Sequence, residues 1–145
     1  MPVNKTVAGI LEEKGDQVWS IEPSATVFEA LQLLAEKNLG AVVVIDDGKL
    51  VGIMSERDYA RKVVLLDRMS KKTIVTEIMT ADVITVAPDA RVSDCMSLMT
   101  ERRIRHLPVV EDDRLVGLVS IGDVVRAVIA EREFIINQLE QYIQS

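Results

Sequence analysis

The sequence predicts an α+β fold made of two β-α-β-β-α repeats. When the chain is shifted by 65 residues, residues 18–64 align with residues 83–129 without a gap, and 15 of the 47 aligned positions are identical. Each repeat combines short apolar runs, which are typical of strands, with a segment whose apolar residues recur at helical spacing. A unit of about 65 residues buries little surface by itself. We therefore expect the two repeats to pack together around an internal pseudo-twofold axis.

The elements of the first repeat follow from where its apolar runs begin and end. Its first strand ends before Pro23, because proline cannot continue a hydrogen-bonded ladder. Its first helix has Val27, Ala30, Leu31 and Leu34 at positions i, i+3, i+4 and i+7. The expected elements are a strand at 18–21, a helix at 27–37, strands at 41–45 and 50–54 around an acidic turn at 46–49, and a second helix that begins at Ser55.

The second repeat has the same elements 65 residues later. They are a strand at 83–86, a helix at 92–103, strands at 107–110 and 115–119 around an acidic turn at 111–114, and a second helix that begins at Ser120. The chain is therefore divided into an N-terminal lead-in helix at 1–17, repeat 1 at 18–66, a linker and second lead-in at 67–82, repeat 2 at 83–130, and an amphipathic C-terminal helix at 131–145.

Composition argues against several classes of function. The chain has 17 Lys and Arg against 23 Asp and Glu, a net charge of −6, whereas nucleic-acid binding requires a basic surface. One cysteine, Cys95, and one histidine, His106, supply neither a disulfide nor a zinc site, and Cys95 is expected to be a small buried residue. The sequence shows no nucleophile–base set, P-loop or dinucleotide-binding glycine pattern. We expect a protein that is not an enzyme and has no catalytic cofactor or metal.

The apolar runs are also too short for a membrane protein. The densest of them, at 41–45, is far shorter than a bilayer-spanning helix. The first residues lack the long apolar stretch of a signal peptide. We expect a soluble cytoplasmic protein without membrane contact.

Three motifs resemble those of a tandem CBS-domain pair, often called a Bateman module. The Gly-apolar-apolar-Ser-x-x-Asp pattern occurs at 52–58 and again at 117–123, in the same position of each repeat. Residues 104–110 (IRHLPVV) resemble the second-strand motif of the family, and residues 77–80 (EIMT) resemble its usual lead-in. The resemblance extends from about Thr6 to Ala130. It implies binding of adenosine-containing ligands such as AMP, ADP, ATP, NAD or S-adenosylmethionine, and a conformational response to them.

The Ser-x-x-Asp motif has two interpretations that the residues alone leave open. Ser55 and Asp58 have the spacing of a capping box, in which each side chain bonds the other residue's backbone at a helix start. Alternatively, the carboxylate accepts hydrogen bonds from the two hydroxyls of a ribose, while the helix start and Arg57 favour a phosphate. The resemblance favours ribose binding. The remaining alternative is a ligand-free structural or protein-interaction module in which both motifs are helix caps only.

The resemblance implies two nucleotide sites, one for each motif, and the two sites are expected to differ. Repeat 2 has Gly122 where repeat 1 has Arg57, Asp16 stands where a small residue is expected, and Leu11 replaces the hydroxyl of Thr76. Site A comprises Ser55, Arg57, Asp58, Thr76, Ala81, Val83, Ile104 and Arg105. Site B comprises Asp16, Val18, Leu39, Gly40, Arg105, His106, Ser120, Gly122 and Asp123.

The C-terminal segment predicts an interaction surface. Its apolar residues follow helical spacing beyond the last repeat, so they need a partner surface. They are Phe134, Ile135, Leu139, Tyr142 and Ile143. We expect these residues to form a homodimer interface, which agrees with the usual assembly of the family. The alternatives are packing on the chain's own domain and docking of an unidentified effector protein.

Overall fold

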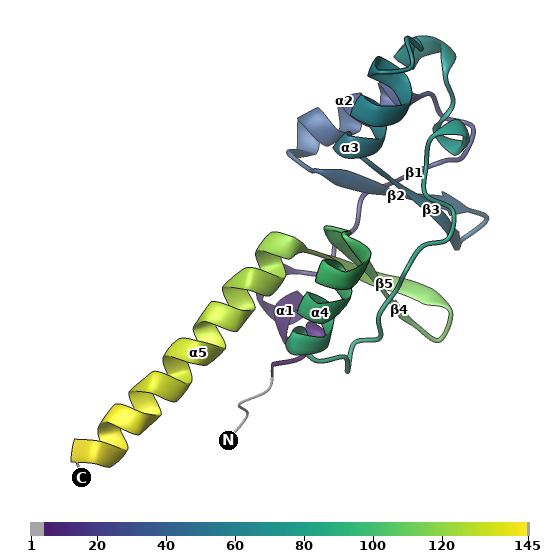
Figure 1. The fold of residues 1–145 in the computed structure, drawn as a ribbon. Helices are drawn as coiled ribbons and strands as arrows, with labels where there is room; N and C mark the ends of the chain where they lie inside the picture. Colours follow the sequence, from purple (N-terminus) through teal and green to yellow (C-terminus); the bar gives the residue numbers. More distant parts are fainter. Residues whose placement is uncertain (1–4, 145) are drawn as a thin grey trace. The chain divides into compact units, whose positions relative to one another are not determined.

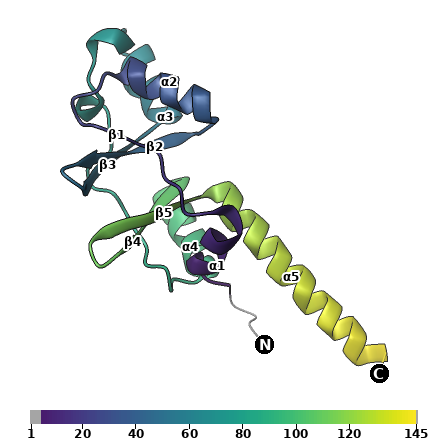
Figure 2. The ribbon, with the colours of Figure 1, turned by 180° about the vertical axis from the view of Figure 1, so that it is seen from behind.

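The computed structural model describes residues 5–144 of the chain, which form two compact units (Figures 1 and 2). Unit 1 contains the described residues 5–17, 85–112 and 116–144. Unit 2 contains residues 18–84 and 113–115. Each unit thus combines one repeat with the lead-in segment that precedes the other repeat in the sequence.

Unit 2 is an antiparallel strand pair with a short parallel strand at its edge. The strand order is β1-β2-β3, with β1 parallel to β2 and β2 antiparallel to β3. Helices α2 and α3 lie on one side of this sheet (Figures 1 and 2). The elements are β1 (Ser20–Ile21), α2 (Val27–Lys37), β2 (Ala41–Asp46), β3 (Lys49–Ser55) and α3 (Glu56–Tyr59), followed by a π-helical turn (Ala60–Val64) and two 3₁₀ turns (Ser70–Lys72 and Val75–Glu77).

The core of unit 2 joins α2, the sheet and the second lead-in. The buried face of α2 is the predicted one, and strand β2 is buried over 41–44, as its uninterrupted apolar run predicts. Val75 and Ile78 of the lead-in complete this core. Trp19 is half-buried, and the Lys37 Nζ is 4.2 Å from the centroid of its ring.

Unit 1 has the same plan with a smaller sheet and a longer last helix. Strands β4 and β5 form a two-stranded sheet, and Val86 makes a single parallel bridge to Val109. The elements are α1 (Val7–Lys14), α4 (Val92–Arg102), β4 (His106–Glu111), β5 (Arg114–Ser120), whose first two residues are grouped with unit 2, and α5 (Ile121–Gln144).

The prediction of a strand at 83–86 is therefore wrong, because the structure has only a single bridge there. In repeat 1, Ser20 and Ile21 pair with Val43 and Val44. In repeat 2 the residue equivalent to Val43 is Pro108, which has no backbone N–H to donate to the neighbouring chain. Only the bonds from Val86 N to the Pro108 carbonyl and from Val110 N to the Val86 carbonyl remain, at 3.1 and 2.9 Å.

Each lead-in is joined to a repeat by equivalent backbone hydrogen bonds. Val7 N donates to the Ala90 carbonyl at 2.9 Å, and Val75 N donates to the Ala25 carbonyl at 2.8 Å. Residues of the two repeats are equivalent at an offset of 65, but these bonds make the lead-ins equivalent at an offset of 68. Helix α1 thus has three more residues before repeat 1 begins than the second lead-in has before repeat 2.

This offset corrects the expected equivalence of Leu11 and Thr76. Leu11 is instead equivalent to Met79, and both side chains lie over a glycine. A Cβ on Gly117 would stand 2.7 Å from both Leu11 methyl carbons, and a Cβ on Gly52 would overlap the Met79 sulfur. The glycine of each Ser-x-x-Asp motif therefore makes room for the side chain of a lead-in.

Helix α5 is one continuous helix from Ile121 to Gln144. The C-terminal helix expected at 131–145 is the continuation of the last helix of repeat 2, and Ser145 lies outside the described residues. Its first turns pack against α4 and α1, while its later turns extend past them (Figure 1). No helix within residues 5–144 combines the length and apolar character needed to cross a membrane.

Candidate functional site

In unit 2, Ser55 and Asp58 form the capping box that their spacing predicts. The Asp58 Oδ2 accepts hydrogen bonds from Ser55 N at 2.9 Å and from Ser55 Oγ at 3.1 Å, and Asp58 N donates to Ser55 Oγ at 3.2 Å. These bonds hold the carboxylate at the point where β3 ends and α3 begins. The Asp58 Oδ1 lies 3.5 Å from the Lys62 Nζ.

Lys62 connects this motif to the second lead-in. Its Nζ donates to the Ile78 carbonyl at 2.9 Å while lying near the Asp58 carboxylate. Lys62 was not among the predicted site residues. Its position four residues after Asp58 in a helical segment is a signal that could have identified it.

The other residues predicted for site A are divided between the two units. Unit 2 contains Arg57, Thr76 and Ala81, all exposed, and the half-buried Val83. These side chains are accessible to a ligand and are outside the buried core. Ile104, half-buried, and Arg105, exposed, belong to unit 1.

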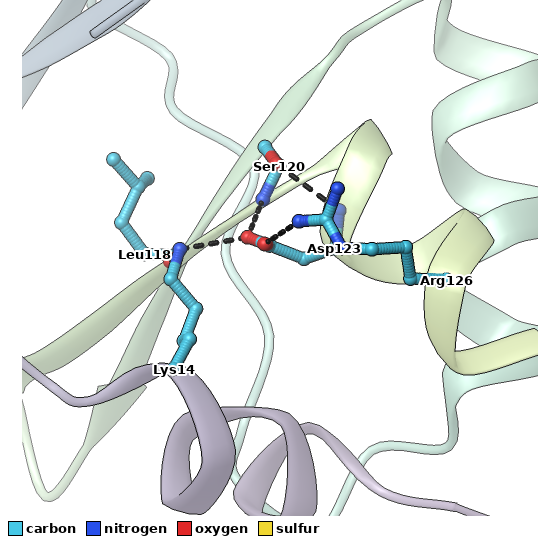
Figure 3. A network of polar contacts seen from close by, with 5 residues as sticks. All are labelled: Lys14, Leu118, Ser120, Asp123 and Arg126. Carbon is cyan, nitrogen blue, oxygen red and sulfur yellow. Dashed lines mark hydrogen bonds and ion pairs between the residues drawn. The ribbon is translucent and has the colours of Figure 1, made fainter. Parts of the chain in front are cut away.

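In unit 1, Ser120 and Asp123 form an equivalent box with two additional cationic partners (Figure 3). Ser120 N donates to the Asp123 Oδ2 at 2.8 Å, and Asp123 N donates to Ser120 Oγ at 3.2 Å. The Lys14 Nζ also donates to Oδ2, at 2.7 Å, and the Arg126 Nη2 donates to Oδ1, at 2.8 Å. The Asp123 side chain is only 7% exposed.

Lys14 is held from two directions at once. Besides its bond to Asp123, its Nζ donates to the Leu118 carbonyl of β5 at 2.9 Å. Figure 3 shows Lys14 reaching from α1 toward the start of α5. Helix α1 is thereby tied at its last residue to the strand and to the helix that flank the Ser-x-x-Asp motif.

Burial and charge oppose each other at Asp123. Burial raises the pKa of its carboxyl group. The hydrogen bond and charge of Lys14 and the hydrogen bonds from Ser120 lower this pKa by more than burial raises it, so the net pKa is below its usual value. The pKa of His106 is also lowered, first by burial and then by the charges of Lys14 and Arg105, while Asp123 raises it. The structure therefore favours an ionised Asp123 and a neutral His106.

The predicted residues of site B are likewise divided. Unit 1 contains the exposed Asp16 and the half-buried His106 and Gly122, and unit 2 contains Val18, Leu39 and Gly40. Gly122 itself carries no charge, but a Cβ at this position would stand 3.4 Å from the Arg126 Nη1. A guanidinium therefore lies over the position where repeat 1 has Arg57.

Lys14 and Arg126 were not predicted. Arg126 could have been found, since it follows Asp123 by three residues on a predicted helix. Lys14 had no such signal, because it lies 109 positions before Asp123 in the sequence and outside the aligned repeats.

Known proteins identify the family to which the chain belongs. The family model for the CBS domain matches the chain twice, at residues 15–65 and 75–130. The chain belongs to the CBS-domain family and contains a pair of these domains. A mitochondrial CBS domain-containing protein of Arabidopsis thaliana, CBSX3, is 43% identical over 96% of this chain and 72% of its own length.

Solved structures with the same fold include proteins of similar sequence. A putative signal-transduction protein with CBS domains from Burkholderia ambifaria is 50% identical, with a TM-score of 0.85 over 87% of this chain and 95% of its own. The CBS domain pair of protein MJ0100, solved with 5′-methylthioadenosine and S-adenosyl-L-methionine, is 29% identical, with a TM-score of 0.77 over 88% of this chain and 98% of its own.

Proposed function

We propose that this chain is a regulatory module that binds an adenine nucleotide, such as AMP, ADP, ATP or NAD, with Asp58 as the ribose acceptor. The observation that carries the proposal is the state of the Asp58 carboxylate. Its Oδ2 is fixed by Ser55, while the nearest described cation, Lys62, is 3.5 Å from Oδ1. The carboxylate is thus positioned by the chain and keeps acceptor capacity on Oδ1.

A ribose suits such a carboxylate because its two neighbouring hydroxyls are both donors. Hydrogen bonds to an ionised acceptor contribute about 1.5–3 kcal/mol each. Arg57, next in sequence to Asp58 and exposed, supplies a cation for the phosphate that a nucleotide carries. The proposed contacts of the base in the same unit are the accessible side chains of Thr76, Ala81 and Val83. Ile104 and Arg105, which belong to unit 1, remain predicted contacts of the nucleotide.

The relatives support an adenosine-containing ligand. The CBS pair of MJ0100 was solved with two compounds that both contain adenosine. The proposal assigns the binding of such a ligand to this chain and gives it no catalytic step. Steady conversion of any of these nucleotides by the purified protein would contradict the latter part.

A second candidate is a ligand-free interaction module. The observation that favours it is that both Ser-x-x-Asp boxes are complete through protein atoms alone. In that case each aspartate stabilises its helix start and has no further role.

The first prediction separates the two candidates. Protein refolded to remove bound small molecules is titrated calorimetrically with AMP, ADP, ATP, NAD, S-adenosylmethionine and GMP. We expect adenine-selective binding that weakens at least tenfold in Asp58→Ala, because the ribose loses its charged acceptor. A ligand at a hundred times its dissociation constant should also raise the unfolding free energy by about 2.7 kcal/mol.

The control variant is Asp46→Ala, which removes an exposed carboxylate at the end of β2 without altering the box. If Asp58→Ala lowers stability while the unmodified protein binds none of the compounds, the interaction module is the correct interpretation.

We further propose that the output of the module is carried by a homodimer formed through α5. Exposed apolar residues recur along this helix at alternating spacings of four and three, at Val125, Ile129, Ile136, Leu139 and Ile143, with Arg132 between them. This 3.5-residue period is that of a coiled-coil seam, so a second copy of the same helix is a partner of matching shape.

A further inference from the structure

The two aspartates of the Ser-x-x-Asp motifs differ in how much of their acceptor capacity the chain itself uses. We propose that Lys14 is an internal competitor for the Asp123 carboxylate, so that a ribose can be bound there only when the Lys14 ammonium moves away. This inference rests on the proposed function, because it concerns the second of the two predicted sites. It makes Lys14 a specificity-determining residue.

The lone pairs of the Asp123 carboxylate limit how many donors it can bind. Each carboxylate oxygen accepts about two hydrogen bonds. The Asp123 Oδ2 already accepts from Ser120 N and from the Lys14 Nζ, at 2.8 and 2.7 Å, and Oδ1 accepts from Arg126. A ribose that donates one hydroxyl to each oxygen finds room on Oδ1 but none on Oδ2.

Of the donors on Oδ2, Lys14 is the one that can leave. The Ser120 amide is fixed by the backbone at the junction of β5 and α5. The Lys14 side chain is 38% exposed and flexible, and its ammonium can be hydrated when it is released. The Asp58 Oδ2 also accepts two hydrogen bonds, but its second donor is the neutral hydroxyl of Ser55, which can rotate away without leaving a charge unpaired.

The competition discriminates between ligands by charge. A neutral riboside must displace the ammonium and offers it nothing in return. A nucleotide also displaces it, but its phosphate gives the released Lys14 and the exposed Arg126 a new anionic partner. The Asp123 site should therefore prefer phosphate-bearing ribosides more strongly than the Asp58 site does.

The displacement also has a consequence along the chain. Lys14 is the last residue of α1, and Gly15 follows with a φ of +95°, a conformation that favours glycine. Two residues later the chain leaves unit 1 and enters unit 2 at Val18. A ligand that removes Lys14 from Asp123 thus frees the end of one of the segments through which the chain passes from unit 1 to unit 2.

The test measures adenosine and AMP binding in an Asp58→Ala background, in which Asp123 is the remaining acceptor. We expect Lys14→Met to tighten adenosine binding about tenfold, which corresponds to about 1.4 kcal/mol, and to tighten AMP binding less or weaken it. Lys14→Met should at the same time lower thermal stability, because Asp123 loses a partner. If Lys14 had a purely structural role, Lys14→Met would lower both the stability of the protein and its affinity for adenosine.

Two further variants make the result decisive. Lys14→Gln keeps a hydrogen-bond donor without the charge and should give an intermediate change. Lys5→Met removes a lysine from the same end of the chain, where it is 3.7 Å from Glu13, and should leave both affinities unchanged. Unchanged or weaker adenosine binding in Lys14→Met would overturn the role of Lys14 while leaving the Asp58 site intact. Absence of binding of both adenosine and AMP to the unmodified protein would overturn both proposals.

Discussion

At the scale of single residues, the same four-residue motif has two electrostatic environments. Asp58 lies in a half-buried box with one lysine nearby, whereas Asp123 is buried and bonded by a lysine and an arginine. His106 responds to the second environment, because burial and the charges of Lys14 and Arg105 lower its pKa. A half-buried neutral histidine close to two cationic side chains resists protonation in the folded state.

The resulting prediction concerns stability in mild acid. The unfolded chain binds a proton at His106 near pH 6.5, whereas the folded chain binds it only at lower pH. Between these two pKa values the unfolded state holds more protons, so the unfolding free energy should fall as the pH decreases below about 6.5. The fall should level off below the pKa of the folded state. Urea unfolding between pH 7.5 and 5 measures this.

The single histidine makes the control simple. In His106→Gln the decline in this pH range should be lost, while the loss of stability on protonation of Asp123, whose folded pKa is below its usual value, should still occur in much stronger acid. An unchanged decline in His106→Gln would show that carboxylates cause it.

At this scale the sequence predicted the local bonds better than the long-range ones. Both capping boxes follow from spacing within four residues, and the structure contains both. Lys14 reaches Asp123 across 109 positions of the chain, and the repeat alignment gave no equivalent for it. Contacts of this kind depend on how α1 packs, which no local pattern encodes.

At the scale of elements, each lead-in is attached to its unit at a glycine. Gly117 of β5 lies under Leu11, and Gly52 of β3 lies under Met79. Any side chain at these glycines would push the lead-in away from the strand. Since the lead-ins also contribute buried residues, Val7 and Ile10 in one case and Val75 and Ile78 in the other, such a change would disturb the core.

We therefore expect Gly117→Ala to lower the unfolding free energy by about 1–3 kcal/mol, as overpacking does. Gly52→Ala should cost less, because the unbranched side chain of Met79 adapts more easily than that of Leu11. Combining Gly117→Ala with Leu11→Ala should give a double mutant more stable than the sum of the single changes predicts. Chemical denaturation measures all three, and strict additivity would contradict the proposed contact.

The elements themselves were largely predictable. The helix expected at 27–37 has those bounds, and the apolar spacing of its buried face is confirmed. The strand expected at 83–86 failed because Pro108, on the partner strand, lacks the donor that a second bridge requires. A proline removes a hydrogen-bond donor from the neighbouring strand as well as from its own. The sequence of residues 83–86 alone does not show this effect.

At the scale of the whole molecule, the two repeats form two units with the same order of elements, and the helices at the two ends of the chain, α1 and α5, make the units different. Lys14 at the end of α1 binds Asp123, and α5 continues far beyond the length of α3, which ends at Tyr59. Both helices belong to unit 1. The fold of the family was evident from the repeat, while Lys14 and most of the C-terminal extension of α5 lie outside the aligned residues.

The prediction at this scale concerns assembly. If α5 pairs with a second copy, the protein should be a dimer by light scattering after size-exclusion chromatography. The double variant Ile136→Glu, Ile143→Glu should be a monomer, because it places charges in the apolar seam. Gln141→Glu adds a charge on the same helix outside this seam and should remain a dimer. A monomeric unmodified protein would contradict the proposed interface.

Trp19 and His106 lie in different units of the chain. Trp19, the only tryptophan of the chain, belongs to unit 2, and its indole is in contact with the Lys37 ammonium. Its fluorescence emission should therefore report on that unit alone, and the imidazole resonances of His106 should report on the other. A protein whose halves are nearly alike thus carries a native spectroscopic probe in each, so ligand titrations could be followed in each half without chemical labelling.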